Sequence, residues 1–359
     1  MKKLLSLLVV AILLLGVVAP GVAQDDVNPY RPTELFEAVD ALKAATEGQS
    51  APSDAKFVLL TNAVAPFWTA AQTGASRASL EFNVPILFQA PTAAEKLLQQ
   101  LSMLETFVND NFTAITFSAI DREAPADIIK SAVDKGIHVL CTDSDATGSE
   151  RSMYIGMSDY DAGYAAGKAA LEIIGSGQVV GLVGYATAQN AQDRIAGVND
   201  ALEGTDLELV EVLLDDIKPE VALSNAQTAM QTYPDLAGFI TFYSYDGPMA
   251  CQAVKAAGKE GEVKIVAFDA EPQTQTCMEE GVVQAMIGQR VYFYGYLSGW
   301  VMYAMSVLGE EATMEVLDPW LSDLGDEGKI HLNTGVDVIK ADTFDLYREY
   351  LESIGIPSQ

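Results

Sequence analysis

The chain has 359 residues, of which 49% are hydrophobic, so it can bury one or two substantial cores. Aspartate and glutamate number 50 against 21 lysines and arginines, which gives a formal net charge of −29. A surface this acidic repels phosphate backbones, and this excludes nucleic acid as a partner.

The N-terminus has the form of a secretory signal peptide, predicted to span residues 1–23. Two lysines precede an apolar run at residues 4–19, and the small residue Ala23 marks the expected cleavage point. The run, at about 16 residues, is shorter than the ~20 that a membrane-spanning helix needs. The first cysteine is Cys141, so no lipid anchor is expected. We therefore expect a protein free in the periplasm or an equivalent extracytoplasmic space.

After a polar lead-in at residues 24–54, which holds one helical segment at 33–46, short apolar runs alternate with segments of helical periodicity. The runs are apolar at consecutive positions, as is typical of strands covered on both faces in parallel sheets. The predicted strands are 57–61, 84–89, 114–118, 138–142, 179–184, 209–214, 239–242 and 264–268. This βαβα succession predicts an α/β fold with helices on both faces of its sheets.

The alternation runs twice, over residues 56–157 and about 160–287. Each half has the size of a domain, so two similar doubly wound lobes are predicted instead of one large sheet. The stretch 309–329 is acidic and predicted to be irregular. A strand-like run at 335–339 and a helix at 343–354 close the chain, and the C-terminal helical unit is assigned to 341–359.

Ligands of open α/β sheets bind beyond the carboxyl ends of the strands, so the residues that follow each predicted strand are the candidate site. These residues are Phe67 and Trp68, Asp143 and Ser144, Asn190 and Arg194, Tyr245 and Asp246, and Asp269 and Gln289. Carboxylates accept hydrogen bonds from hydroxyls, arginine donates in a fixed fork, and an aromatic face covers the apolar side of a sugar ring. The set suits a polyhydroxylated ligand.

Each candidate also has a purely structural interpretation. Phe67 and Trp68 could be packing residues of a helix. Asp143 and Asp269 could be helix N-caps, which are common after strands. Arg194 could be a surface charge, although the apolar positions beside it suggest a buried edge. The sequence leaves these alternatives open.

Signatures of catalysis and of metal or cofactor binding are weak. His138 lies in an apolar strand and is interpreted as a core residue, and His331 lies in the irregular C-terminal part. Glycines at 175–181 have the wrong spacing for a dinucleotide-binding turn and precede a strand. The run from Asp143 resembles the start of a calcium loop but lacks the glutamate at its twelfth position. We expect no enzyme activity, metal or cofactor.

Three cysteines are an odd number for an exported chain. Cys141 lies in an apolar run and is interpreted as core. Cys251 and Cys277 lie in two successive predicted helices of one region. Whether they form a disulfide depends on their approach in space, which the sequence leaves open.

Several short motifs follow one another along residues 56–340. They are Ala65-Pro66-Phe67-Trp68, Thr142-Asp143-Ser144-Asp145-Ala146, Tyr154-Ile155-Gly156 with Asp159-Tyr160-Asp161-Ala162-Gly163, Asn190-Ala191-Gln192-Asp193-Arg194-Ile195-Ala196-Gly197, Tyr245-Asp246-Gly247-Pro248, Ala267-Phe268-Asp269, and Gln289. In order and spacing they resemble the type I periplasmic binding proteins of sugar ABC transporters, of the ribose- and galactose-binding kind.

The resemblance assigns roles to the candidate residues. It implies that Phe67 and Trp68 flank a sugar ring and that Asn190 and Tyr245 line the wall of the second lobe. The residues that it implies bond ring hydroxyls are Asp143, Arg194, Asp269 and Gln289. Two positions depart from the family pattern, because Ala65 replaces a usual asparagine and Tyr245 stands where asparagine is frequent. Both departures leave the identity of the sugar open.

The resemblance also implies three crossovers between the lobes, near residues 157–159, near 288–290 and within about 321–334. Lobe 1 would then comprise residues 55–158 with about 290–320, and lobe 2 would comprise 159–289 with about 321–340.

A receptor of this kind closes by a hinge around a pentose, a hexose or a related polyol and delivers it to an ABC transporter permease. A monomer that meets only the membrane components of its transporter is expected. One alternative is a receptor for an autoinducer-2-type signal, from the same superfamily. A less favoured alternative is a secreted carbohydrate hydrolase that uses Asp143 and Asp269 as its carboxyl pair. Intracellular repressors of this fold do not fit a signal peptide and an acidic chain.

Overall fold

The computed structural model describes residues 28–184, 189–323 and 330–356. The predicted signal peptide, residues 1–23, lies outside the described residues. Within the described residues, the search for a helix both long and apolar enough to cross a membrane finds none.

The first lobe is built around a seven-stranded sheet. Its elements from the first half of the chain are β1 (Phe57–Leu60), α2 (Trp68–Phe82), β2 (Ile86–Gln89), α3 (Lys96–Asn109), β3 (Ala114–Phe117), α4 (Ala126–Asp134), β4 (His138–Thr142) and β5 (Met153–Gly156). The chain returns to this lobe with α10 (Val291–Leu308), α11 (Glu310–Leu317), the 3-10 turn η1 (Asp318–Trp320), β11 (Leu321–Asp323) and β12 (Ile330–Asn333). β1, β3 and β5 are buried at every position, which explains their consecutive apolar residues.

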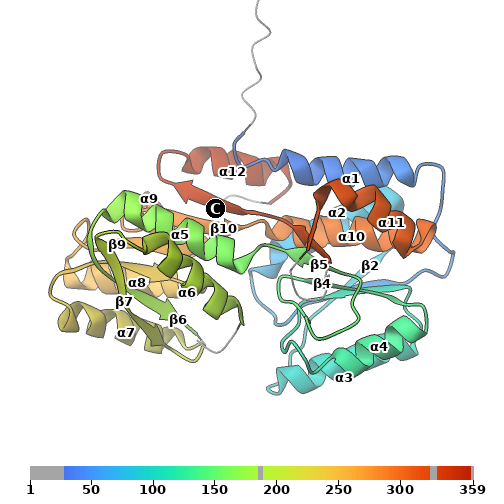
Figure 1. Ribbon diagram of the computed structural model, residues 1–359, viewed down its shortest axis with the longest axis horizontal. Helices are drawn as coiled ribbons and strands as arrows, with labels where there is room; N and C mark the ends of the chain where they lie inside the picture. The colour runs from blue at the N-terminus through green and yellow to red at the C-terminus, as the bar shows by residue number, and fades with distance from the viewer. Residues whose placement is uncertain (1–27, 185–188, 324–329, 357–359) are drawn as a thin grey trace, which may run out of the picture.

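The second lobe is built around a six-stranded sheet. Its elements are α5 (Asp159–Ile174), β6 (Gly177–Val183), α6 (Gln189–Leu202), β7 (Leu207–Leu214), α7 (Pro219–Thr232), β8 (Leu236–Thr241), α8 (Asp246–Ala257), β9 (Lys264–Phe268), α9 (Pro272–Glu279), β10 (Ala285–Gln289) and β13 (Val336–Lys340). Figure 1 shows the two lobes side by side, each with helices on both faces of its sheet.

The two sheets repeat one topology. The first five strands of each lobe along the chain are parallel and run in the order β2-β1-β3-β4-β5 in the first lobe and β7-β6-β8-β9-β10 in the second. Beyond them, β12 adds a parallel strand beside β5, whereas β13 is antiparallel to β10. In each lobe, the order reverses beside the first strand, which is the switch point where ligands of doubly wound sheets bind. The predicted fold of two similar doubly wound lobes is confirmed.

Three connections join the lobes. They lie between β5 and α5, between β10 and α10, and at Thr334–Gly335 between β12 and β13. The first two agree with the crossovers implied by the resemblance. The third lies at the C-terminal end of its predicted range, so residues 321–333 differ from the predicted boundary: β11 and β12 extend the first sheet, and only β13 joins the second.

The stretch 309–329, predicted to be irregular, is largely regular where the structure describes it. It holds α11, η1 and β11. His331, assigned to the same irregular region, lies instead in strand β12, where its Nε2 atom is 2.9 Å from the carbonyl oxygen of Gly156 and its ring stacks on Tyr154. The sequence did not predict these elements, because charged residues form the exposed faces of the helix and of the edge strand.

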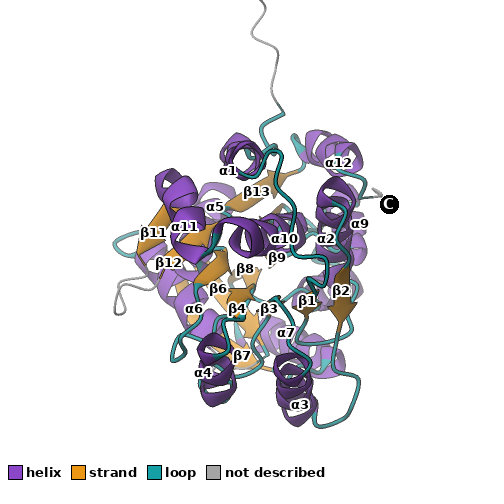
Figure 2. Ribbon diagram, turned by 90° about the vertical axis from the view of Figure 1, so that its right-hand side faces the viewer, coloured by secondary structure: helices purple, strands orange, loops and turns teal. Residues whose placement is uncertain are grey.

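The chain ends bridge the hinge. Tyr30 contacts the second lobe through the ring of Tyr347, while the following helix α1 (Thr33–Ala45) buries Leu35 and Val39 in the core of the first lobe. Helix α12 (Phe344–Ser353) begins on β13 of the second lobe, and the residues after it reach Thr73 of α2 in the first. Figures 1 and 2 both place α1 and α12 at one side of the molecule, over the crossovers.

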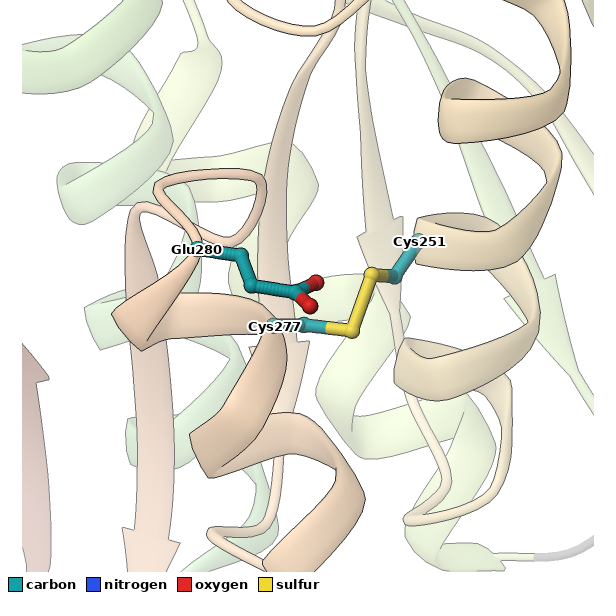
Figure 3. A group of neighbouring side chains, drawn as sticks. All are labelled: Cys251, Cys277 and Glu280. Atoms are coloured by element: carbon teal, nitrogen blue, oxygen red, sulfur yellow. A yellow bond between two sulfur atoms is a disulfide. The ribbon is translucent and has the colours of Figure 1, made fainter.

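Cys251 and Cys277 form a disulfide that joins α8 to α9 (Figure 3), so the pairing that the sequence left open is made. Glu280 lies beside the two sulfur atoms, and these three side chains are the one metal-type cluster found among the described residues. Because both sulfurs are in the disulfide, no thiolate is left there to bind a metal. Cys141 is a buried free thiol in β4, as predicted.

Candidate functional site

Asp143 and Asp269 occupy equivalent places in the two lobes. Asp143 follows β4 and Asp269 follows β9, each the fourth parallel strand of its lobe along the chain. Their backbone N–H groups donate to Ile155 and Ile287 on the adjacent strands β5 and β10. Both have positive φ values, 63° and 65°, which are uncommon for residues other than glycine and concentrate at functional sites.

A hydrogen-bond network holds Asp143 in the first lobe. Ser118, at the end of β3, donates its hydroxyl to Oδ2 of Asp143 at 2.7 Å, and the amide of Asn62 approaches the same oxygen at 3.5 Å. The indole N–H of Trp68 donates to Asn62 at 3.2 Å. These contacts fix the carboxylate from three strand ends.

The two aromatic candidates have different positions. Trp68 is 4% exposed and packs against Tyr294 of α10, so it follows the packing interpretation. Phe67 is half-buried, stands edge-on to the Trp68 ring, and lines a cavity between the lobes. Phe67 therefore offers more of its ring surface to a ligand than Trp68 does.

Arg194 is buried in the second lobe, and the surface-charge interpretation is wrong. Its Nε donates to Asp159 at 2.8 Å and its Nη1 donates to the carbonyl of Phe242 at 2.7 Å. The guanidinium also lies over the ring of Phe268, 4.6 Å from the ring centroid. This arrangement orients the guanidinium firmly and leaves some of its N–H groups for a ligand.

Gln289 connects the lobes at the second crossover. Its Nε2 donates to Oδ1 of Asp269 at 2.9 Å, and its Oε1 accepts from the hydroxyl of Tyr294 at 3.0 Å. Tyr294 belongs to α10 of the first lobe, whereas Asp269 belongs to the second. The amide is therefore part of a hydrogen-bonded chain from one lobe to the other.

The electrostatics show that these groups share one buried region. Burial raises the pKa of Asp143 to about 7; the hydroxyl of Ser118 and the charge of Arg194 oppose this, while Asp159 and Asp269 add to it. Burial likewise raises the pKa of Asp269 to about 6, against the effects of Arg194 and Gln289. Since Asp143 belongs to one lobe and the other charges to the opposite lobe, they face one another across the cleft.

The remaining candidates lie in other hydrogen-bond networks. Tyr245 donates its hydroxyl to Asp215, and burial and the charge of Asp215 raise the pKa of the fully buried Asp246. The side-chain oxygen of Asn190 accepts from Tyr243 at 3.2 Å. Ser144 contributes its backbone carbonyl, which accepts from Ala119. The structure thus groups Tyr245 and Asp246 with Asp215, within the second lobe.

Matching this chain to known families gives a match to the periplasmic binding protein domain over residues 57–311. The chain belongs to this family. Its resemblance to the sugar-binding type I members is confirmed.

The relatives in this family share about a quarter of the aligned residues with this chain, over half to three quarters of its length. The D-ribose/D-allose-binding protein of Pseudomonas aeruginosa is 25% identical over 53% of this chain and 62% of that protein. The ribose import binding protein of Escherichia coli K12 is 24% identical over 73% of this chain and 88% of that protein. A solved sugar-binding protein of a sugar ABC transporter from Bacillus halodurans has the same fold, with a TM-score of 0.70 and 24% identity, over 82% of this chain and all of that one.

Several residues that lie beside the candidate site were not assigned from the sequence. Ser118 follows β3, so the rule that polar residues at strand ends form the site would have found it. Asp159, the ion partner of Arg194, stands at the start of α5. It was part of a sequence motif but was given no role in the site. Tyr294 lies in a strongly apolar helix, where nothing marks its hydroxyl as part of a site.

Proposed function

We propose that the chain is an exported receptor that binds a monosaccharide or related polyol between its lobes and delivers it to an ABC transporter permease. The observation that carries the proposal is the division of the cleft. Asp143 comes from the first lobe, and Arg194, Asp269 and Gln289 come from the second lobe and its crossover. A ligand that bonds to both walls stabilises the closed form in proportion to its preference for that form.

The chemistry of the walls supports a sugar. Carboxylates and an amide oxygen accept from hydroxyls, the Arg194 guanidinium donates to ring or hydroxyl oxygens, and Phe67 offers an apolar face. Relatives named for ribose and allose binding support the same class. Leaving any of these buried polar groups unpaired costs about 1–3 kcal/mol, which would let the site reject a sugar that lacks one hydroxyl.

A thermal-unfolding screen of pentoses, hexoses and polyols tests this function. We expect one sugar to raise the melting temperature, because ligand at 100 times its dissociation constant adds about 2.7 kcal/mol to the free energy of unfolding. The variant Asp143→Asn should lose most of this effect, whereas Asp127→Asn, on the exposed side of α4, should retain it.

Two results would contradict the proposal. Stabilisation by an autoinducer-2-type compound and by no sugar would favour a signal receptor. Release of product from glycosides, abolished in Asp143→Asn, would favour a hydrolase.

A further inference from the structure

A cavity of about 280 Å³ adjoins the candidate site on the side of the hinge. Phe67, Asp269 and Gln289 line it, and the same three residues belong to the candidate sugar site. These three residues therefore form a wall that the cleft and the cavity have in common. The volume of the cavity is close to the lower end of the range of small-molecule pockets, roughly 300–1,000 Å³.

The outer wall of this hinge pocket comes largely from the C-terminal helix. Tyr347 and Tyr350 of α12, Ile354 directly after it, and Tyr292 of α10 line the pocket. The helix lies beyond residue 311, where the family match ends. The pocket is thus closed in part by a segment of this chain that lies outside the matched residues.

Three carboxyl groups and one guanidinium are the charged groups in the lining of the pocket. Gln275 is 7% exposed, its Nε2 donates to the carbonyl of Ala270 at 2.6 Å, and its buried Oε1 has no hydrogen-bond partner. The guanidinium of Arg290 also lines the pocket, and its Nε, Nη1 and Nη2 atoms all donate hydrogen bonds, to Asp337, Glu34 and the carbonyl of Thr334. The carboxyl groups of Asp269, Glu271 and Asp337 disfavour an anionic group in the pocket. A neutral group with a hydroxyl or N–H can instead donate a hydrogen bond to Oε1 of Gln275.

We propose that the ligand is a substituted sugar, a glycoside or disaccharide, whose first ring lies in the cleft and whose second ring occupies the hinge pocket. This inference rests on the proposed function. The second ring needs an apolar face for the tyrosine rings and a donor for Gln275, which both a sugar ring and a hydroxylated aromatic ring provide. The substituent leaves the first ring past Phe67 and Gln289.

Titration calorimetry with free sugars, disaccharides and aryl glycosides of the same sugars tests the inference. We expect a substituted sugar to bind at least about tenfold more tightly than its free sugar, since the second ring adds buried contact and one hydrogen bond. The disaccharide and aryl arms show which kind of ring the pocket takes. Free sugars that bind as tightly as every substituted form would overturn the inference and leave the proposed function intact.

Two variants locate the second ring. Ile354→Trp fills the pocket and Gln275→Leu removes its unpaired acceptor; each should weaken substituted sugars about fivefold or more and leave free sugars within about twofold. Leu346→Trp is the matched control, because Leu346 lies on α12 and is 38% exposed. It should change the affinity for neither kind of sugar.

If both substitutions weaken free and substituted sugars equally, or neither weakens the substituted sugar, the second ring does not lie there. Gln275→Leu keeps the test decisive if Ile354→Trp prevents folding. Binding of no sugar of either kind would overturn the proposed function and this inference together.

Discussion

Burial brings the ionisation of Asp143 and Asp269 into the range near neutral pH. Their pKa values of about 7 and about 6 lie above the ordinary value of 3.8, mainly because burial disfavours the charged carboxylate. The folded protein therefore holds protons that the unfolded chain releases. Between pH 4 and 7 this difference reduces the free energy of unfolding as pH rises, because ionisation of the buried groups opposes folding.

Asp269→Asn should therefore stabilise the ligand-free protein at pH 8. The gain should be roughly 1–3 kcal/mol, since one pKa unit corresponds to about 1.4 kcal/mol, and it should shrink towards pH 4, where the wild-type carboxyl is protonated. Denaturant unfolding at both pH values measures it. Asp127→Asn, at an exposed position, is the control, and a loss of stability at pH 8 in Asp269→Asn would mean that burial is not the dominant effect.

The same ionisation should appear in the binding of ligand. If the carboxylates accept hydroxyl hydrogen bonds in their charged form, affinity should rise by about tenfold or more between pH 5 and pH 8, because at pH 5 only roughly one tenth of Asp269 is ionised. Calorimetry across this range measures the rise. Asp269→Asn should bind more weakly at pH 8 and show a shallower dependence; an equally steep profile in the variant would assign the titration elsewhere.

At the scale of elements, close helix pairs position the site. Gly163 of α5 and Gly197 of α6 touch the partner backbone: an added Cβ would lie 2.0 Å from the carbonyl oxygen of Arg194 and 2.1 Å from that of Tyr160. In the first lobe, Gly74 of α2 and Gly295 of α10 make the same kind of contact. These pairs place Arg194 and Tyr294 against the cleft, because each residue lies on a helix that can approach its neighbour only through glycine.

Gly163→Ala should separate α5 from α6 and displace Arg194. Overpacking in a rigid contact costs about 1–3 kcal/mol, and backbone atoms 2.0 Å away cannot relax as a side chain would, so we expect about 3 kcal/mol or more. Ligand affinity should fall as well. Denaturant unfolding and calorimetry measure both effects, with the exposed Lys168→Ala on α5 as control; unchanged stability would show that the helices can move apart freely.

The disulfide between α8 and α9 is a second contact between elements that stabilises the fold. It closes a loop with a sequence separation of 26 residues, for which chain entropy predicts about 3–4 kcal/mol of stabilisation. Replacing Cys251 and Cys277 by alanine should lower the free energy of unfolding by about that amount. Ligand affinity should remain within about twofold, since the bond lies outside the cleft residues; a large loss of affinity would contradict that separation.

At the scale of the whole molecule, three short connections join the two lobes, and the lobes can rotate relative to each other only around these connections. The helices at the two ends of the chain cover the connections (Figures 1 and 2). Besides the hinge contacts, the loop after β3 reaches the second lobe, where Arg122 donates to Gln189 at 2.9 Å. Both side chains are exposed, so the bond forms and breaks without a large desolvation penalty. It is suited to hold the lobes together when a ligand has closed them.

Arg122→Ala should accelerate release of ligand by about two- to fivefold and leave the association rate nearly unchanged, because one exposed hydrogen bond of the closed form is lost. Stopped-flow kinetics with the sugar identified by the thermal screen measures both rates. Lys130→Ala, whose ion pairs stay within the first lobe, is the control. An unchanged release rate would show that the bond does not contribute to closure.

Strand ends were the most predictable part of the site. The apolar runs located every parallel strand except β5, β10 and β12. The residues that follow the located strands include Asp143, Asp269 and Arg194, which the structure brings together. Tyr245 and Asp246 also follow a strand, yet they face Asp215. Position along the chain gives the edge of the sheet at which a side chain lies, but neighbouring loops decide its direction.

The sequence by itself determined the two lobes and their parallel sheets, and it supplied the candidate residues of the cleft, because burial of both sheet faces and the strand-end rule act locally along the chain. Only the tertiary structure decided the disulfide, the packing of Trp68 on Tyr294, the assignment of β11 and β12 to the first sheet and the hinge pocket behind Phe67. Each of these depends on contacts between residues far apart in the chain. Their distances in space follow from how the helices and crossovers pack, which no local pattern of residues records.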